Sequence, residues 1–224
     1  MVRNKELYKR AEALRKNGKS YSEVSETLHL AESTISSWFS GKKWSESIKA
    51  QLIEKHKEES RNQLIRLNAL KRIGTLKRHE SYRKEAKLEY EKMKNNRLFI
   101  AGLSIYWGEG AKRGIGTVSV INTESDMLQV AVNFYRKILK VPEPKLRAAL
   151  FLYQDINERK ALDYWSKKVK IPKKQFIKTQ KLQSRSVLTK RRSINGICNV
   201  YFSDTKLNIK IREWIQLLAS EMRV

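Results

Sequence analysis

Gly102-Leu-Ser-Ile-Tyr-Trp-Gly-Glu-Gly110 is an apolar segment that ends in a carboxylate between two glycines. The segment predicts a helix, and small residues at spacings of three and four fall on one face of it: Ala101, Ser104 and Gly108. Small side chains on one face let a second helix approach closely, so these residues form a candidate dimer interface. We expect Gly110 to end the helix, which puts Glu109 at the tip of the helix pair.

The charge of the chain points to an anionic partner. Its 224 residues include 48 Lys and Arg against 23 Asp and Glu, a formal net charge of +25. Such a charge repels itself unless a partner offsets it, so nucleic acid is the first candidate. A membrane surface is the weaker candidate, because the longest apolar run, residues 98–107, is about half of a bilayer span. A carboxylate facing a basic surface then suggests a divalent metal held against a phosphate.

The location of the protein follows from its cysteine content and its first residues. The single Cys198 excludes an internal disulfide and fits a reducing compartment. The first residues lack the apolar segment of a secretory signal. We expect a cytoplasmic protein, associated with the nucleoid if it is prokaryotic.

Residues 1–43 predict short helices around a tight turn. Residues 6–16 have helical spacing, and Ser20 with Glu23 is typical of a helix start in which the two residues cap each other. The offsets of four later apolar residues resemble the helix-turn-helix of the resolvase and invertase type: Leu28, Leu30, Ile35 and Trp38. His29 stands in place of the usual turn glycine, and a histidine adopts the left-handed backbone at modest cost.

This resemblance implies DNA binding through the second helix of the motif. Hydroxyl side chains are expected to face the major groove there: Ser33, Thr34, Ser36 and Ser37. Lys42 and Lys43 follow at the phosphate rim. The alternative is a three-helix interaction module in which these hydroxyls are simply solvated. Because the groove face carries little positive charge, this unit alone is expected to bind weakly.

Residues 44–95 are charged, free of proline and most simply one or two helices. Apolar residues repeat along them, with Gly74 interrupting the run: Leu64, Leu67, Leu70, Ile73 and Leu76. A coiled-coil arm, a basic helix along DNA and a solvated tether all fit this pattern. We treat the segment as a basic helical linker.

Residues 96–224 contain all the strand-like runs. The expected strands are residues 117–121, 146–153, 175–182 and 196–202, and the expected helices after the first are residues 122–138, 157–169 and 206–222. The predicted class is therefore α+β, in three parts: an all-α helix-turn-helix at 1–43, the linker at 44–95 and an α/β domain at 96–224.

The order of elements in residues 96–224 resembles the LAGLIDADG homing-endonuclease domain. With Gly110 on the terminal glycine of that motif, Glu109 takes the position of the family's metal-binding acid. Ser104 and Gly108 take two of its small interface positions. The sequence departs from the motif where the family often has Leu, Ala and Asp: at Gly102, Leu103 and Trp107.

The resemblance implies a homodimer on a roughly palindromic DNA site, since the chain holds one motif. It also implies curved antiparallel sheets astride the major groove and one catalytic acid from each copy binding Mg²⁺ over the scissile phosphates. One carboxylate cannot hold a hard cation alone, but two carboxylates with water and phosphate oxygens can. We therefore expect site-specific, metal-dependent cleavage of double-stranded DNA. The alternative is a transcription regulator that uses the same fold without cleavage.

The last zone also predicts a phosphate-binding surface. From residue 164 to residue 203 there is no acidic residue and there are eleven Lys or Arg, whereas solvated charge runs usually mix signs. Candidate DNA contacts in this zone follow the motif glycine or lie in the basic run: Lys112, Arg113, Lys173, Lys174, Lys178, Lys181, Arg185, Lys190, Arg191 and Arg192.

Overall fold

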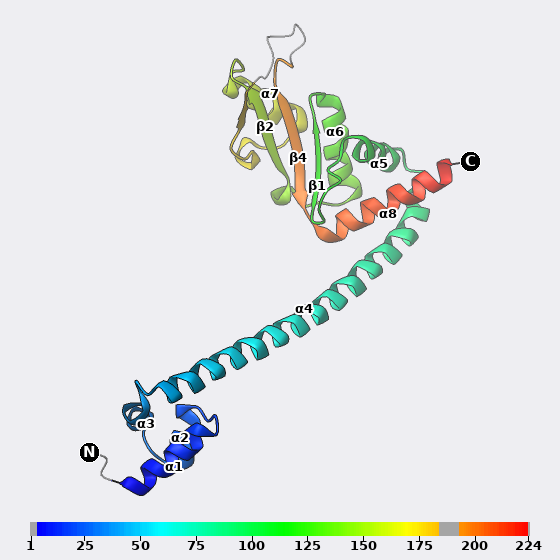
Figure 1. Cartoon of the computed structure of the whole chain (residues 1–224). Coiled ribbons are helices and arrows are strands. Elements are labelled where there is room, and N and C mark those ends of the chain that lie inside the picture. The colour runs from blue at the N-terminus through cyan, green and yellow to red at the C-terminus, as the bar shows by residue number, and fades with distance from the viewer. Residues whose placement is uncertain (1–3, 184–192, 224) are drawn as a thin grey trace. The chain divides into compact units, whose positions relative to one another are not determined.

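A computed structural model describes residues 4–183 and 193–223 (Figure 1). The chain divides into two compact units, Met1–Gly74 and Thr75–Val224. The first unit is helical, and the second holds a four-stranded sheet with helices. The predicted α+β class is confirmed.

The first unit contains three short helices and the start of a long one: α1 (Lys5–Lys16), α2 (Tyr21–Leu28), α3 (Glu32–Phe39) and α4 (Lys43–Met93). Its core comprises Ala11, Val24, Ile35 and Phe39, each fully buried. Aromatic rings surround Phe39, at centroid distances of 5.4 Å for both Tyr8 and Trp44. Phe39 is therefore the centre of this small core.

The start of α2 has the predicted capping box. The Ser20 hydroxyl accepts the amide N–H of Glu23, and the Glu23 carboxylate accepts the amide N–H of Ser20. The hydrogen bond from Lys19, together with that capping, lowers the pKa of Glu23 to about 2. The charged carboxylate therefore persists at neutral pH, where it caps the helix and favours its N-terminus.

Arg15 joins α1 to the start of α4. Its side chain is 2% exposed and donates to the Ser45 carbonyl at 2.9 Å and to the Lys19 carbonyl at 2.7 Å. The guanidinium also lies 4.5 Å from the centroid of the Tyr21 ring. A buried cation is tolerated only when its donors are satisfied, and here carbonyls and a ring satisfy them.

Helix α4 runs without a break through Gly74, where the sequence suggested an interruption. The residues expected as a seam are all exposed, for example Leu64 at 58% and Leu70 at 59%. Each step of three residues rotates by roughly 60° from the previous one on an α-helix, so these side chains wind around the helix. A coiled-coil seam is therefore not what this pattern encodes.

The second unit is built on a sheet of order β1-β4-β2-β3: β1 (Thr117–Asn122), β2 (Arg147–Tyr153), β3 (Gln180–Leu182) and β4 (Ile197–Ser203). Strand β4 pairs antiparallel with β1 and with β2, whereas β2 pairs parallel with β3. The expected antiparallel sheet was therefore wrong for one pair of strands. The expected strand at 175–182 is also shorter, because residues 173–175 form a 3₁₀ turn.

The helices of the second unit pack on one face of this sheet: α5 (Arg97–Glu109), α6 (Ser125–Asn133), α7 (Glu158–Val169) and α8 (Thr205–Met222). A π-helical turn (Phe134–Ile138) follows α6, and 3₁₀ turns occupy Glu143–Lys145 and Lys173–Gln175. Alternate strand residues face this layer and are buried: Val118, Val120, Ala148, Leu150, Leu152, Cys198, Val200 and Phe202. The C-terminal part of α4 joins the same core through Ala86 and Tyr90.

Candidate nucleic-acid interface

Helix α5 has a buried face and an outward face. Phe99, Leu103 and Tyr106 are buried in the core. On the opposite side of the helix, Ser104 and Gly108 are exposed and Ala101 is half-buried. The predicted interface residues thus share an outward face, as their spacing required.

The two glycines of α5 have different surroundings. A Cβ on Gly102 would lie 2.2 Å from the ring of Phe134, so this glycine is required by packing within the chain. A Cβ on Gly108 would meet nothing within 4 Å. The fold of the described chain therefore gives no packing reason for a glycine at 108.

Glu109 is the last residue of α5, and its side chain is exposed. Gly110 ends the helix as predicted. Its backbone is extended, with φ −76° and ψ 151°, and a Cβ there would lie 2.3 Å from the carbonyl oxygen of Tyr106. Close approach to the preceding turn, and not a left-handed conformation, requires the glycine.

Two cations follow the acid within four residues. Lys112 and Arg113 are both exposed, in a loop that joins Gly110 to β1. A carboxylate and two positive side chains therefore belong to one short, exposed segment. This combination can present a metal-binding oxygen and phosphate-binding donors on one surface.

The turn between α2 and α3 has the geometry that the sequence predicted for it. His29 is left-handed, with φ 53° and ψ 42°. Ser25, at the position of the usual small residue, donates its hydroxyl to the carbonyl of Leu30 at 2.5 Å. This hydrogen bond links α2 to the last part of the turn that leads into α3.

The four hydroxyl residues of α3 that were predicted to face the major groove differ in exposure. Ser33 and Ser37 are exposed, whereas Thr34 and Ser36 are half-buried. Lys43 is exposed at the start of α4.

Lys42, predicted at the phosphate rim, is half-buried and turned into the unit. Its ammonium donates to the Tyr8 hydroxyl and lies 4.9 Å and 5.6 Å from the rings of Tyr8 and Phe39.

Two of the predicted lysines in the basic run already have acidic partners. Lys173 forms an ion pair with Asp163, and Lys181 lies 3.3 Å from a carboxylate oxygen of Glu158. Lys174 and Lys178 are also exposed. The remaining predicted contacts lie outside the described residues: Arg185, Lys190, Arg191 and Arg192.

A double variant tests this surface. Lys174→Gln with Lys178→Gln is expected to flatten the dependence of log K on log salt by about 1.8, since each lost phosphate contact removes about 0.9. The measurement is a fluorescence-anisotropy titration of duplex DNA at several salt concentrations. Lys137→Gln with Lys140→Gln removes the same charge from exposed positions in the helical layer and should leave the slope unchanged. If the Lys174/Lys178 variant also keeps the wild-type slope, these two lysines are excluded from the interface.

The sequence prediction missed the residues on the second face of the sheet. The strand register there aligns Ser119, Tyr201 and Arg147 across three strands. Asn199 lies in the next row, and its side-chain oxygen accepts the Ser119 hydroxyl at 2.7 Å. These side chains are half-buried, polar or aromatic, and none is acidic. The alternation of apolar with other residues in each strand was the signal that could have found them.

No family model, curated protein or solved structure matches this chain. The LAGLIDADG and helix-turn-helix resemblances therefore stay predictions from the sequence. None of the helices in the described ranges is long and apolar enough to span a bilayer.

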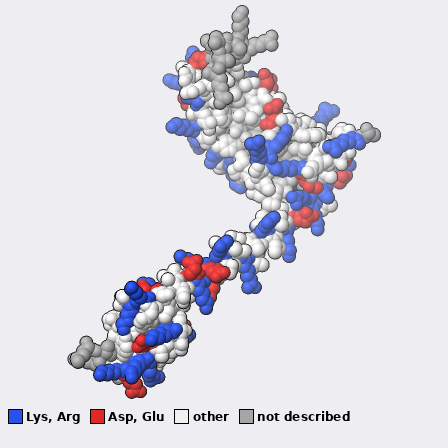
Figure 2. Space-filling model, viewed as in Figure 1, with Lys and Arg blue, Asp and Glu red and all other residues white. Residues whose placement is uncertain are grey.

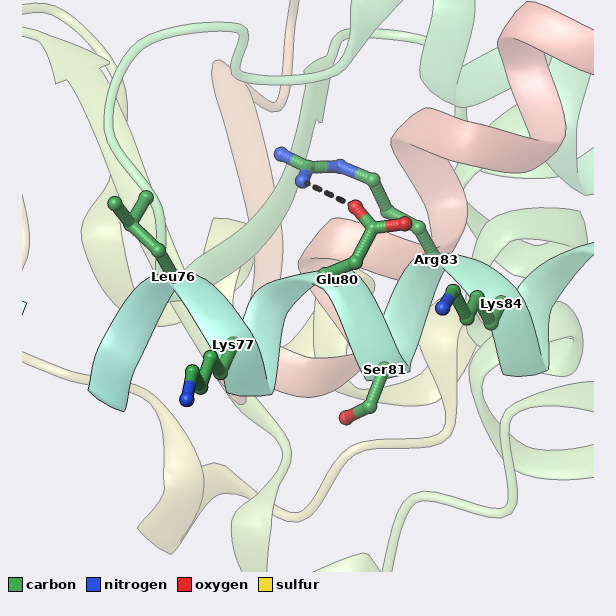
Figure 3. Close-up of a pocket in the computed structure, with 6 residues that line it drawn as sticks. All are labelled: Leu76, Lys77, Glu80, Ser81, Arg83 and Lys84. Carbon is green, nitrogen blue, oxygen red and sulfur yellow. Dashed lines mark ion pairs between the residues drawn. The ribbon is translucent and has the colours of Figure 1, made fainter. Parts of the chain in front are cut away.

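Two further features of the surface are its charge distribution and an open recess beside α4. On the face shown in Figure 2, Lys and Arg side chains are spread over both units. A recess of the second unit is lined by side chains of one helix, α4, with Glu80 3.5 Å from Arg83 (Figure 3). Within residues 4–183 and 193–223, no group of three or more His, Cys, Asp or Glu side chains is placed to hold a metal ion.

Proposed function

We propose that this protein binds double-stranded DNA as a homodimer and cleaves it with a divalent metal ion. The proposal rests on Glu109, which is exposed at the end of α5. The same helix has an outward face of small residues, and Lys112 and Arg113 follow Glu109 in the sequence. Two copies joined through that face bring two carboxylates together, with cations beside each. A DNA backbone is the polyanion that such a pair fits.

The first unit supports DNA binding independently. The left-handed turn at His29 and the bond from Ser25 to Leu30 are what a tight helix-turn-helix requires. Its second helix exposes Ser33 and Ser37, side chains that hydrogen-bond base edges or phosphates. In the proposal this unit reads flanking DNA while the second unit acts at the cleavage site.

The oxygen ligands that one chain offers can be compared with those that a metal ion needs. Glu109 supplies one carboxylate, and a hard cation such as Mg²⁺ takes six oxygen ligands, several of them water. One chain alone therefore does not fit the metal, whereas two Glu109 carboxylates with water and phosphate oxygens do. When bound, the metal would supply an activated water and would stabilise the leaving oxygen.

A transcription regulator is the second candidate. The attached first unit favours it, because a nuclease does not need a separate reading module. Glu109 argues against it, since an acid that faces phosphates repels them and weakens pure binding. The two functions differ in whether duplex DNA is cut in Mg²⁺, and that assay decides between them.

Gly108→Ala tests the dimer through α5. If no second helix packs against Gly108, the added methyl group stabilises α5 by up to about 1 kcal/mol and leaves the mass of the particle in solution unchanged. In the proposed dimer the methyl group forces the two helices apart at a cost of about 1–3 kcal/mol, so the dimer dissociation constant rises about five- to 150-fold. Sedimentation velocity over a concentration series measures this constant.

Ser220→Ala, a small change at an exposed position of α8, is the control and should leave self-association unchanged. A more stable Gly108→Ala protein with the wild-type mass distribution would rule out this interface.

A further inference from the structure

The loop after Glu109 is tied to α8 by three residues spaced four apart. The amide N–H of Asp204 donates to the Gly116 carbonyl at 2.7 Å, and the Asn208 side chain donates to the Thr117 carbonyl at 2.9 Å. Arg212 donates to the carbonyls of Lys112, at 3.1 Å, and Gly114. Residues four apart lie on one helical face, so one edge of α8 together with its N-cap Asp204 holds four carbonyls between residues 112 and 117.

Tyr106 holds Ala111, the residue just before the loop, by a hydrogen bond of its own. Its hydroxyl donates to the carbonyl of Ala111 at 2.9 Å and accepts from the side-chain amide of Asn208 at 3.2 Å. Burial raises the pKa of Tyr106, so the hydroxyl keeps its proton and remains a donor. Asn208 is fully buried and links the two ends of the loop through Tyr106 and Thr117.

The backbone N–H groups of the same loop differ from its carbonyls. Across residues 112–116, no amide N–H donates a hydrogen bond to any described residue. The side chains of Lys112 and Arg113 are exposed, and Gly114 and Gly116 have φ of 77° and 139°. Amide N–H groups without a partner among the described residues, in a loop with two positive-φ glycines and two exposed cations, are available to bind an anion.

We propose that the loop Lys112–Gly116 binds a DNA phosphate through its backbone amides, and that Asn208 and Arg212 are positioning residues that hold it in the binding conformation. The inference rests on the proposed function and deepens it, because the loop begins three residues after Glu109. A phosphate seated on this loop lies beside the acid on the same short segment. The backbone supplies a contact that is indifferent to base sequence, as a cleavage site needs.

The test is an amide-resolved titration of the ¹⁵N-labelled full chain with a short DNA duplex. The amide signals of residues 112–116 are expected to shift on binding. Arg212→Gln should abolish these shifts and weaken duplex binding about tenfold, the loss expected for one or two charge-assisted hydrogen bonds. Arg212→Lys is the matched variant, because it keeps the charge but cannot donate in a fixed planar fork to two carbonyls.

The outcomes separate the possible causes. Loss of the amide shifts in both variants supports the positioning role. Wild-type shifts and affinity in Arg212→Lys would mean that only the charge of Arg212 matters, and would overturn that role. Wild-type amides that stay unshifted while the duplex binds elsewhere would overturn the phosphate site but leave cleavage by Glu109 to be assayed separately. Shifts with inorganic phosphate but not with the duplex would assign the loop to a free anion and overturn the DNA contact.

Discussion

Glu109→Gln is expected to lower the rate of duplex cleavage in Mg²⁺ on the order of a thousandfold. The substitution keeps the size of the side chain and removes the charge that holds the metal in the proposed dimer. A metal ligand contributes several kcal/mol of charge stabilisation to the transition state, and each 1.4 kcal/mol is tenfold in rate. The readout is nicking and linearisation of plasmid DNA carrying a site selected by the wild-type protein.

Binding and cleavage should separate in this variant. Because an uncharged side chain no longer repels phosphate, Glu109→Gln is expected to bind the same site with equal or higher affinity in the absence of metal. Glu124→Gln removes an exposed carboxylate at the start of α6 and is the matched control, with cleavage unchanged. If wild type and Glu109→Gln both bind tightly and neither cuts, the nuclease proposal is wrong and the result favours the regulator.

Local patterns predicted the parts of the fold that neighbouring residues determine. The capping box at Ser20 and Glu23 and the left-handed His29 depend on residues within a few positions, and both are present. The outward face of α5 followed from helical spacing alone. One or two helices were predicted for residues 44–95, and α4 is one helix, because a single Gly74 costs about 1 kcal/mol and the helix formers on both sides of it outweigh that cost.

Contacts between distant segments explain what the sequence could not predict. A strand was predicted at residues 175–182, yet the buried Gln175 side chain donates to the carbonyls of Glu143 and Leu146 at 2.6 Å and 2.8 Å. Those bonds favour a turn there, and β3 begins only at Gln180. The attachment of the loop at 112–116 to α8 is likewise invisible in sequence, because Arg212 is about a hundred residues away.

Phe39→Ala is expected to unfold the first unit while the second unit stays folded. Phe39 is fully buried at the centre of that unit's core, and removing a buried phenylalanine side chain costs about 3–5 kcal/mol. A core of this size rarely supplies more than about 3–5 kcal/mol, so the loss is comparable to the whole stability of the unit. Amide spectra should lose dispersion for residues 4–41 and keep it for the sheet.

The consequence for DNA binding distinguishes a reading module from a mere interaction module. If the first unit reads sequence, Phe39→Ala lowers affinity for the selected site toward the non-specific level, about a thousandfold or more, and binding to random duplexes persists through the second unit. Ile53→Ala, at a 46% exposed position of the same unit, should change stability by less than about 0.5 kcal/mol and leave site preference intact. An unfolded first unit with undiminished site preference would place sequence reading in the second unit, since the sheet face with Ser119, Asn199 and Tyr201 would then be the surface available to read bases.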